Sequence, residues 1–452
     1  MQSSSPIKPK RRFTPAQIIA LGFLAIIFLG TLLLMLPISS RTGQVTPFLD
    51  ALFTATSATC VTGLVVYDTY SHWSLFGQFV LLVLIQVGGM GFVTIALIIN
   101  MLRGSKIGLG QRYLMQESVG LPQMGGILRA THWIVRCILL FEGIGALLLA
   151  TQFIPALGFW RGVWYSVFHS VSAFCNAGFD LMGCDTPFSS MTAWMGNPVI
   201  NLTLCALIVI GGLGFAVWSD VFRQRTLVRR YRLQTKIVLA TSAALLILPF
   251  LFFFLYEFRT PQWADLTQGE KFWASLFQAV TPRTAGFNTV DYAKFSGPSL
   301  VLTMALMLVG GSPGSTAGGI KTTTIAAVYL SVRSALRRKQ DVEAFGRRLE
   351  ESALAQAMVL ITIYVLLFLA GACSISMLDG VPMVAAMFES ASAVGTVGLS
   401  MGLTPTLSAP SHLILIFMMY LGRVGGLTLL YALADPKKKA PARMPVERIS
   451  IG

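Results

Sequence analysis

The chain has 452 residues, of which 54% are hydrophobic and only 12% are charged, and its formal net charge is +15. Soluble globular chains carry about 25% charged residues, so this composition excludes that class and predicts an integral membrane protein. The apolar stretches reach the roughly 20 residues that a helix needs to cross a bilayer, and they lack the short alternating pattern of a membrane β-barrel.

The positive charge is distributed in a way that favours a membrane topology over a nucleic-acid partner. Lys and Arg gather in five clusters that alternate with pairs of apolar spans, within residues 8–12, 103–136, 223–236, 333–348 and 437–448. Basic residues accumulate on the cytoplasmic side of membrane proteins, so both termini and the three loops between the pairs are predicted to be cytoplasmic. The apolar run from 13 to 36 is expected to be an uncleaved first helix rather than a signal peptide.

Taken in chain order, four stretches share one sequence of elements: an apolar span, a short amphipathic segment, a glycine loop and a second apolar span. We expect repeats at 1–122, 123–230, 231–348 and 349–452, the first and last with basic cytoplasmic tails. The first spans are expected near 13–37, 127–155, 235–258 and 352–378, and the second spans near 73–102, 197–222, 298–332 and 410–433. The short segments, near 47–59, 161–174, 270–281 and 381–394, cannot cross a bilayer. The predicted fold is all-α, with eight transmembrane helices and four re-entrant pore half-helices around one central pore.

The four loops align around one glycine each: Gly63, Gly178, Gly286 and Gly398. A phenylalanine lies ten residues before the glycine in three repeats and nine before it in the third: Phe53, Phe168, Phe388 and Phe277. A hydroxyl residue lies six residues before the glycine in three repeats and five before it in the third: Ser57, Ser172, Ser392 and Thr281. The third copy is consistently one residue short, which indicates a deletion within a true repeat, and such a repeat determines the architecture.

The glycine loops are the predicted ion-binding site, because glycine permits backbone angles that other residues avoid. Four such loops facing one axis would direct carbonyl oxygens inward, where they can replace the water shell of an ion. The negative ends of the half-helix dipoles would favour a cation. The predicted filter residues are Val61, Thr62, Gly63, Asn176, Ala177, Gly178, Thr284, Ala285, Gly286, Thr396, Val397 and Gly398. The alternative for any single loop is a glycine that caps a helix.

Acidic residues follow three of the four glycines and define a predicted outer mouth of Asp68, Asp180 and Asp291, whereas the fourth repeat offers Ser400 and Thr404. Carboxylates at the mouth of a pore would concentrate cations before entry. The alternative is that each carboxylate is an ordinary solvated loop acid.

The second span of the third repeat is interrupted by glycine, serine and proline between 310 and 319. Proline removes a hydrogen-bond donor and glycine is permissive, so we expect a broken helix with an intramembrane gating loop; a kinked continuous helix is the alternative. The residues of this predicted gate are Gly310, Gly311, Ser312, Pro313, Gly314, Ser315, Thr316, Ala317, Gly318 and Gly319. The glycine clusters near 88–92 and 211–215 are expected to allow close helix packing instead.

Arg423 lies near the middle of the last apolar span, where a charge is costly and suggests a function. We expect it to complete the gate, as an electrostatic barrier under the filter and as a donor to carbonyls of the broken segment. Pairing with a carboxylate on another helix is the alternative. Lys321 is expected to extend toward the cytoplasmic surface, and Arg283 to point away from the pore axis.

In these motifs the chain resembles the KtrB/TrkH family of potassium transporters. The resemblance rests on Thr62-Gly63, on Thr396-Val397-Gly398 and on the segments 175–179, 283–287, 310–321 and 422–426. It implies four M1–P–M2 units in one subunit, filter carbonyls that bind potassium, and a gate formed by the segment after Gly310 with Arg423. It also implies a homodimer in a bacterial-type inner membrane, controlled by a cytosolic nucleotide-binding RCK ring of the KtrA type.

Without the two extra N-terminal helices of TrkH, the chain looks closest to KtrB, in which sodium promotes potassium uptake by symport. The predicted function is therefore potassium uptake, with sodium as the expected activator. No catalysed reaction and no cofactor in this chain are predicted. One alternative is a secondary cation transporter with a central site between repeats, for which Glu142, Glu389 and Arg423 are the candidate ionisable residues. A membrane enzyme is disfavoured because the four histidines, His72, His132, His169 and His412, are scattered.

Overall fold

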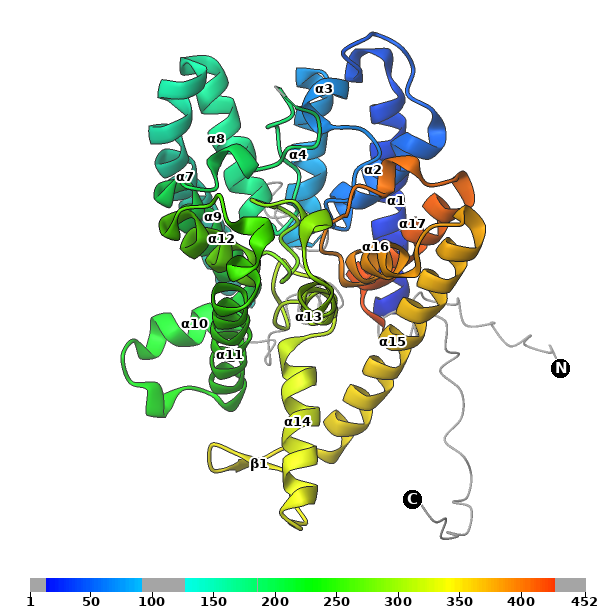
Figure 1. The fold of residues 1–452 in the computed structure, drawn as a ribbon. Helices are drawn as coiled ribbons and strands as arrows, with labels where there is room; N and C mark the ends of the chain where they lie inside the picture. The colour runs from blue at the N-terminus through cyan, green and yellow to red at the C-terminus, as the bar shows by residue number, and fades with distance from the viewer. Residues whose placement is uncertain (1–13, 92–126, 185, 427–452) are drawn as a thin grey trace, which may run out of the picture.

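The computed structural model describes residues 14–91, 127–184 and 186–426, and nearly all of its regular structure is helical (Figure 1). Among these residues the exception is an antiparallel hairpin, β1 (Glu343–Ala344) and β2 (Arg347–Arg348), which the all-α prediction did not include. Phe345 and Gly346 at its turn both have positive φ, +50° and +74°, as a tight two-residue hairpin turn requires. The predicted basic tails and the end of the first repeat lie outside the described residues.

Four helices are long and apolar enough to cross a membrane, and they coincide with the predicted first spans: α1 (Pro15–Met35), α7 (Ile127–Leu157), α11 (Leu233–Leu255) and α15 (Glu351–Asp379). α1 begins at a capping box, in which Thr14 and Gln17 each bond the backbone amide of the other through a side-chain oxygen. The long helices leave large apolar side chains exposed, among them Leu21, Phe28, Leu147, Leu248 and Leu366. Such surfaces are stable against lipid rather than water.

The second apolar spans do not continue as straight helices. α4 (Leu75–Met90) and α17 (Ala409–Val424) each end before a glycine, and α9 (Pro198–Leu213) turns by 96° into α10 (Phe215–Gln224). α13 (Gly297–Leu308) ends well before the chain becomes helical again in α14 (Thr322–Leu336). The predicted span at 197–222 is thus a bent pair. By length and composition, four of the described helices, or five spans if that pair counts as one, could cross a membrane; the total of eight stays a prediction, since the predicted spans at 73–102 and 410–433 extend beyond the described residues.

The ends of α4, α9 and α17 have one cause. Gly91, Gly214 and Gly425 follow these helices with φ of +78°, +94° and +91°. L side chains rarely adopt such angles, and a helix that reaches one ends there. The glycine clusters that predicted close packing therefore also terminate helices, which apolar composition alone did not indicate.

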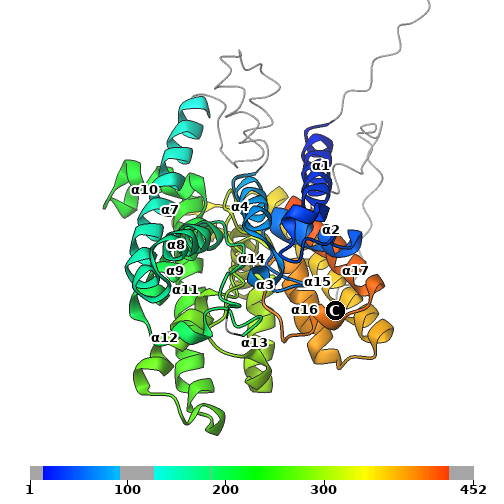
Figure 2. The ribbon, with the colours of Figure 1, turned by 90° about the horizontal axis from the view of Figure 1, so that it is seen from above.

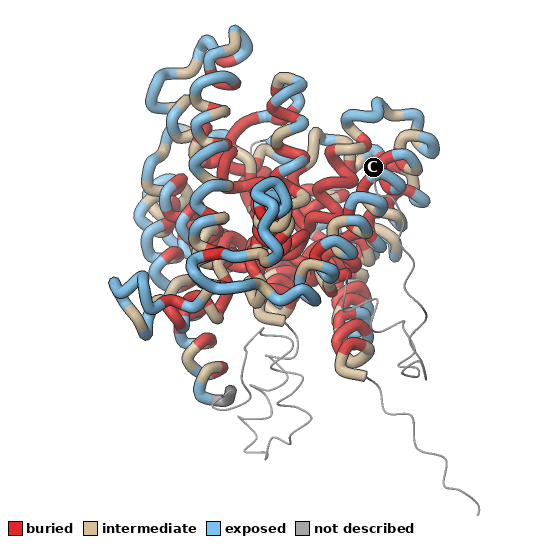
Figure 3. The backbone as a smooth tube through the Cα atoms, turned by 90° about the horizontal axis from the view of Figure 1, so that it is seen from below, coloured by how far each residue is buried: buried red, intermediate tan, exposed pale blue. Residues whose placement is uncertain are grey.

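Four short helices occur where the short segments were predicted: α2 (Phe48–Thr59), α8 (Phe159–Phe174), α12 (Gln268–Val280) and α16 (Met383–Gly395). Each packs against the long helix that precedes it, and each buries the phenylalanine that its repeat shares, Phe53, Phe168, Phe277 and Phe388. Figure 3 shows the buried backbone gathered at the centre of the molecule, with exposed segments around it. The C-terminal halves of the short helices therefore belong to the core, whereas their first turns reach the surface.

The last helix packs on the first two, so the chain closes on itself. α17 contacts α1 and α2, and the Tyr420 hydroxyl donates to the Ala20 carbonyl at 2.8 Å. The blue and orange ends of the described chain accordingly lie side by side in both views (Figures 1 and 2). This closure brings the fourth glycine loop next to the first.

Single helical turns shape the connections: α3 (Thr69–His72), η1 (Pro37–Ser39), η2 (Thr192–Trp194), η3 (Val228–Arg230), η4 (Glu257–Arg259), η5 (Pro261–Trp263), η6 (Tyr292–Lys294) and η7 (Thr404–Thr406). The fully buried carboxylate of Glu257 accepts hydrogen bonds from Trp263 Nε1 at 3.0 Å and Ser299 Oγ at 2.7 Å. A single acid therefore ties η4 and η5 to the start of α13. The apolar core has two large parts, one around α11–α17 with α1 and one around α4–α9.

Candidate functional site

Each short helix leads into a loop whose φ angles alternate in sign. Two residues before the glycine, a non-glycine residue has positive φ: Val61 at +57°, Asn176 at +60°, Thr284 at +66° and Thr396 at +52°. The glycines themselves are also positive: Gly63 at +97°, Gly178 at +69°, Gly286 at +80° and Gly398 at +90°. Alternation in the sign of φ turns successive carbonyls to one side of the chain. A positive φ at a non-glycine residue is uncommon and costs free energy, and backbone strain of this kind clusters at functional sites.

The four loops meet in a closed ring, which we call the carbonyl ring. A Cβ atom added to each glycine would collide with the carbonyl oxygen of the residue that precedes the next glycine. The colliding pairs are Gly63 with Ala177 (2.5 Å), Gly178 with Ala285 (2.8 Å), Gly286 with Val397 (2.7 Å) and Gly398 with Thr62. Only glycine fits at these positions. The four glycines, far apart in the sequence, thus surround one centre together with the four carbonyls before them.

The loops are fastened from behind by the shared hydroxyl residues. In three loops the carbonyl of this residue accepts a hydrogen bond from the amide five residues later, at 2.8 Å: Ser57 from Thr62, Ser172 from Ala177 and Ser392 from Val397. In the third loop Thr281 accepts it from Ala285, four residues later, at 3.0 Å. The shorter third loop is closed by the same bond with one residue fewer. Since these amides are engaged behind the ring, the carbonyls are left to face its centre.

Four buried threonine hydroxyls in the first and fourth loops and at the end of α2 have no partner within the described part of the chain: Thr56, Thr59, Thr62 and Thr396. Buried polar atoms are nearly always bonded to protein, water or an ion. Carbonyl oxygens with free hydroxyls beside them form the kind of oxygen-rich surroundings that replace the hydration shell of an alkali cation. The residues present therefore fit a dehydrated monovalent cation.

Asn176 links two loops to the segment that was predicted to be the gate. Its side-chain nitrogen donates to the Arg283 carbonyl at 3.2 Å and to Thr284 Oγ1 at 3.3 Å. Its side-chain oxygen accepts from Thr316 Oγ1 at 3.2 Å. A displacement of Thr316 would therefore disturb the hydrogen bonds of Asn176 in the second loop and, through them, the third loop.

Three polar side chains of the short helices bind the loop segments that follow the ring glycines. These residues were not assigned to the ring from the sequence. Nε2 of His169 accepts from the Leu181 amide at 3.1 Å, while its Nδ1 bonds the Tyr165 carbonyl at 2.7 Å. Gln278 accepts from the Tyr292 hydroxyl and donates to Thr289 at 3.3 Å.

The third of these residues, Glu389, is fully buried and accepts hydrogen bonds from Ser400 and, at 2.8 Å, from Thr404. His169 and Glu389 lie nine residues before their glycines, and Gln278 lies eight before its own in the shortened repeat. The sequence signal that could have identified these residues is a polar side chain at the same position relative to the glycine in each short helix. Its partners in the following loop could not be read from the sequence.

A cavity of about 370 Å³ adjoins the carbonyl ring and is lined by all four ring glycines; we call it the vestibule. Asp68, Asp180, Ser400 and Thr404 also line it, as expected of an outer mouth. Asp291 does not: it is exposed and caps η6 by accepting a hydrogen bond from the Ala293 amide at 2.9 Å. The prediction that Asp291 lies at the mouth is therefore corrected. The loop after the third glycine leaves the vestibule before the chain reaches Asp291.

The two acids of the vestibule differ in their freedom. The Asp68 carboxylate is engaged by the amides of Ser71 at 2.8 Å and Phe188 at 3.0 Å, so it clasps two loops together. Asp180 accepts one backbone bond, from Met182 at 3.0 Å. Burial is the main cause that raises the pKa of Asp180 to about 7; hydrogen bonds from Met182 and Ser190 lower this pKa, and the nearby Asp68 charge contributes to raising it. We therefore expect the charge of the vestibule to change near neutral pH.

On the side of the α9–α10 bend, the ring faces the segment 309–321, which is not helical and corresponds to the predicted gate. The Ser312 amide donates to the Gly212 carbonyl at 2.9 Å, and the Phe215 amide donates to the Gly314 carbonyl at 2.8 Å. A Cβ atom on Gly318 would collide with the Thr396 side chain, so the segment lies directly against the fourth loop. The alternative of a kinked continuous helix is excluded.

Two cations hold this segment through three consecutive carbonyls. Arg423 donates to the Thr316 carbonyl and also to Gly88 at 2.5 Å. Lys321 donates to the carbonyls of Ala317 at 2.8 Å and Gly318 at 3.2 Å. Arg423 thus bonds the broken segment as expected, and no described carboxylate pairs with it. The expectation that Lys321 extends to the cytoplasmic surface is wrong, because the carbonyls of the unwound segment offer it acceptors nearby.

Arg283 points away from the ring, as expected from the sequence. It is almost fully buried, and its Nη2 donates to Ser242 Oγ of α11 at 3.2 Å. Its Nε and Nη1 have no partner among the described residues. The side chain therefore fastens the third loop to a long helix instead of lining the path of an ion.

Comparison with known proteins gives consistent results. The TrkH family, described as a cation transport protein, matches residues 2–440. Over 449 residues the chain is 39% identical to the potassium/sodium uptake protein NtpJ of Enterococcus hirae, covering 98% of each chain. Over 428 residues it is 39% identical to the Ktr system potassium uptake protein B of Bacillus subtilis, covering 94% of each. Its fold is similar to that of the potassium transporter TrkH of Vibrio parahaemolyticus, with a TM-score of 0.72 at 20% identity over 95% of this chain and 86% of that one.

We expect Arg423→Gln to loosen the segment 309–321, because the substitution removes charge-assisted bonds to Thr316, Gly88 and Gly89. Such bonds contribute about 1.5–3 kcal/mol each, so the amides of the segment should exchange with deuterium at least about tenfold faster. Hydrogen exchange read by mass spectrometry checks this, with the exposed Arg338→Gln as the matched control. Unchanged protection in Arg423→Gln would contradict the role of Arg423 in holding the segment.

Proposed function

The chain belongs to the TrkH family of cation transport proteins, which are membrane proteins and not enzymes, and we propose that it carries potassium through the carbonyl ring. The observation that carries the proposal is the cyclic relation of the four loops, in which each glycine lies against the carbonyl that precedes the next. The relatives named as potassium uptake proteins support potassium as the ion. Uptake across the cell membrane is the proposed direction.

In this proposal the ion enters the vestibule, exchanges its water for the oxygens of the ring and crosses singly. The proposed filter consists of the twelve predicted residues, three from each loop, with their carbonyls as ligands. The positive φ at Val61, Asn176, Thr284 and Thr396 supports this role, since strain of this kind persists where the surrounding structure enforces it. The hydroxyl of Thr62, buried without a partner in the described chain, is a further oxygen near the ring.

We place the gate at residues 310–319 with Arg423. The segment lies against the fourth loop, and Arg423 and Lys321 add two positive charges on the ring's inner side. Fixed cations there oppose the passage of a potassium ion, and the bonds they make to Thr316, Ala317 and Gly318 hold the segment in place. Opening requires the segment to leave the ring with these bonds broken or rearranged.

The Phe215 amide, at the start of α10, donates to Gly314 at the centre of the proposed gate. A movement of α10 would therefore pull directly on the segment. A cytosolic nucleotide-binding ring of the RCK type, KtrA-like, is the proposed partner that moves it, in a homodimer with one pore in each subunit. The relatives named as components of a Ktr system support a partner subunit, and the relative named as a potassium/sodium uptake protein supports sodium as an activator or symported ion.

A secondary transporter with a central carboxylate site is less well supported. Glu389 is engaged by the loop after the fourth glycine, whereas Glu142 accepts from Gln86 at 3.2 Å beside Cys175 of the second loop. The two carboxylates thus serve different loops and do not form one site. Rubidium flux into liposomes that contain the purified chain distinguishes a pore from a secondary transporter, because a pore carries ions down a gradient without a coupling ion.

We expect Gly63→Ser to relax the discrimination of potassium against sodium by at least about tenfold, or about 1.4 kcal/mol, since a side chain there displaces the Ala177 carbonyl. Rubidium and sodium uptake by cells lacking other potassium uptake systems measures the ratio. Gly43→Ser is the control, because Gly43 also has positive φ, +69°, but has open space around it. Unaltered selectivity in Gly63→Ser would rule out the filter assignment.

Glu389 is expected to position the fourth loop. Glu389→Ala leaves the hydroxyls of Ser400 and Thr404 without their acceptor, so we expect weaker potassium selectivity by about tenfold with a smaller effect on protein yield. Glu389→Gln keeps one acceptor oxygen and should recover part of the selectivity. The exposed Glu351→Ala serves as control. A uniform loss of folded protein in both Glu389 variants, with selectivity intact in what remains, would refute the positioning role.

The raised pKa of Asp180 predicts a pH dependence of uptake at limiting potassium. As pH rises from about 6 to about 8, Asp180 changes from mostly neutral to mostly charged and attracts cations to the vestibule, so uptake should rise severalfold. Asp180→Asn should remove this rise. Asp291→Asn, outside the vestibule, should retain it, and an equal pH profile in all three proteins would disprove the assignment.

A further inference from the structure

The end of α14 carries a basic cavity that the proposed ion path does not use. Leu330, Arg333, Ser334 and Arg337 lie three and four residues apart and form one face of the helix. The hairpin β1–β2 folds back against this face, and a cavity of about 410 Å³ lies between them, lined also by Lys339, Glu343, Ala344, Phe345 and Gly346.

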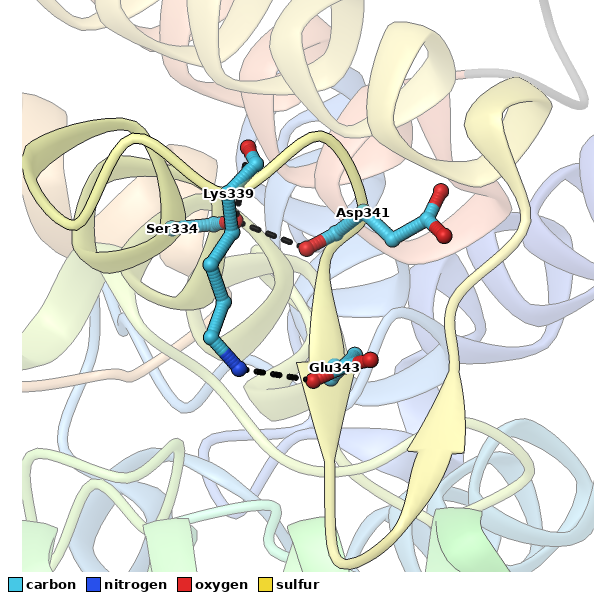
Figure 4. A network of polar contacts seen from close by, with 4 residues as sticks. All are labelled: Ser334, Lys339, Asp341 and Glu343. Atoms are coloured by element: carbon cyan, nitrogen blue, oxygen red, sulfur yellow. Dashed lines mark hydrogen bonds and ion pairs between the residues drawn. The ribbon is translucent and has the colours of Figure 1, made fainter.

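Hydrogen bonds keep the cavity in shape. Ser334 Oγ donates to the Asp341 carbonyl at 2.8 Å, which ties the chain entering the hairpin to the helix (Figure 4). Lys339 Nζ pairs with Glu343 of the hairpin at 2.8 Å (Figure 4), and both residues line the cavity. Ala344 is buried in a small apolar cluster with Ile237 of α11 and Ala326 of α14. The hairpin is therefore fixed to two helices and is not a free loop.

The charges of the cavity are unbalanced. Three cations, Arg333, Arg337 and Lys339, face one carboxylate, Glu343. Within the described chain the guanidinium groups of Arg333 and Arg337 have no hydrogen bond or ion pair, and Asp341, the other nearby acid, pairs with Arg348 at 3.2 Å. Two arginines four residues apart, about one helical turn, lie on one helix face and can bind one phosphate group together.

An apolar strip adjoins this basic face on the same helix. Tyr329, Val332 and Leu336 follow one another at three and four residues and are 65%, 54% and 81% exposed. On a helical projection Arg333 lies directly beside this strip. A phospholipid has the same arrangement, with acyl chains next to a negatively charged headgroup.

We propose that this cavity binds the phosphodiester headgroup of an anionic phospholipid, with acyl chains along Tyr329, Val332 and Leu336. Basic pockets at the ends of membrane helices commonly receive such headgroups. The proposal requires only that this end of α14 reach one headgroup layer of the membrane. It can therefore be tested independently of the proposed ion path. A bound lipid would hold the hairpin and α14, which leads directly from the proposed gate.

The test is native mass spectrometry of the purified full chain with phosphatidylglycerol or phosphatidylcholine added. We expect the wild-type chain to prefer phosphatidylglycerol, and Arg333→Gln with Arg337→Gln to weaken its binding at least about tenfold, since each basic residue near a headgroup layer contributes several-fold. Glu343→Gln should strengthen the binding, because it removes the opposing charge and frees Lys339. Arg229→Gln with Arg230→Gln is the matched control: it removes two exposed arginines that do not line the cavity, and binding should be unchanged.

Three outcomes would overturn the proposal. One is equal retention of both lipids by the wild-type chain. Another is complete displacement of phosphatidylglycerol by inorganic phosphate, which would make the cavity a site for a free anion. The third is full phosphatidylglycerol binding in the Arg333 and Arg337 double variant, which would show that these two arginines do not hold the headgroup.

Discussion

The carbonyl oxygens at the ends of the four short helices impose the constraint on which the structure depends. Inside a membrane protein every backbone polar group needs a partner, because no bulk water supplies one. The amides of Thr62, Ala177 and Val397 find theirs behind the ring, in the carbonyls of the shared serines. The carbonyls of the same residues, together with that of Ala285, surround the centre, where we propose a cation as the partner that satisfies four of them together. The glycines are required because the carbonyls stand too close to admit a side chain.

The same requirement explains the glycines of the second helices. A Cβ atom on Gly88, Gly211 or Gly422 would collide with the carbonyl four residues before a ring glycine, those of Thr59, Phe174 and Val394. α4, α9 and α17 therefore support the short helices at close range, and each ends at a glycine with positive φ three residues later. In the third repeat, α13 ends at Leu308 and the unwound segment takes this place, so the repeat that differs in sequence also differs in what lies under the ring.

How far the sequence predicted the site depended on how local the signal was. The glycine loops, the shortened third copy and the break after Leu308 were visible because repetition, glycine and proline act on the backbone where they stand. The bend at Gly214 was missed because an apolar glycine cluster is equally compatible with a packed helix. The long side chain of Lys321 could reach either water or carbonyls, and only the fold decides between them. His169, Gln278 and Glu389 shared a register, but their partners lie in loops whose course, like that carrying Asp291 away from the vestibule, depends on tertiary packing.

Arg423 and Lys321 stabilise the segment 309–321 through several charge-assisted hydrogen bonds at once. They approach three successive carbonyls from different helices, and Arg423 also reaches α4, so the segment is held between elements that are distant in the sequence. Charge-assisted bonds of this kind contribute about 1.5–3 kcal/mol each, and breaking one of them strands a charge in apolar surroundings. As the proposed gate, a segment held in this way would not open by small thermal steps, because its bonds would have to be exchanged together. In the gating proposal, the Phe215–Gly314 bond is the route by which a movement of α10 would impose that exchange, so the bend at Gly214 would belong to the gate as well as to the fold.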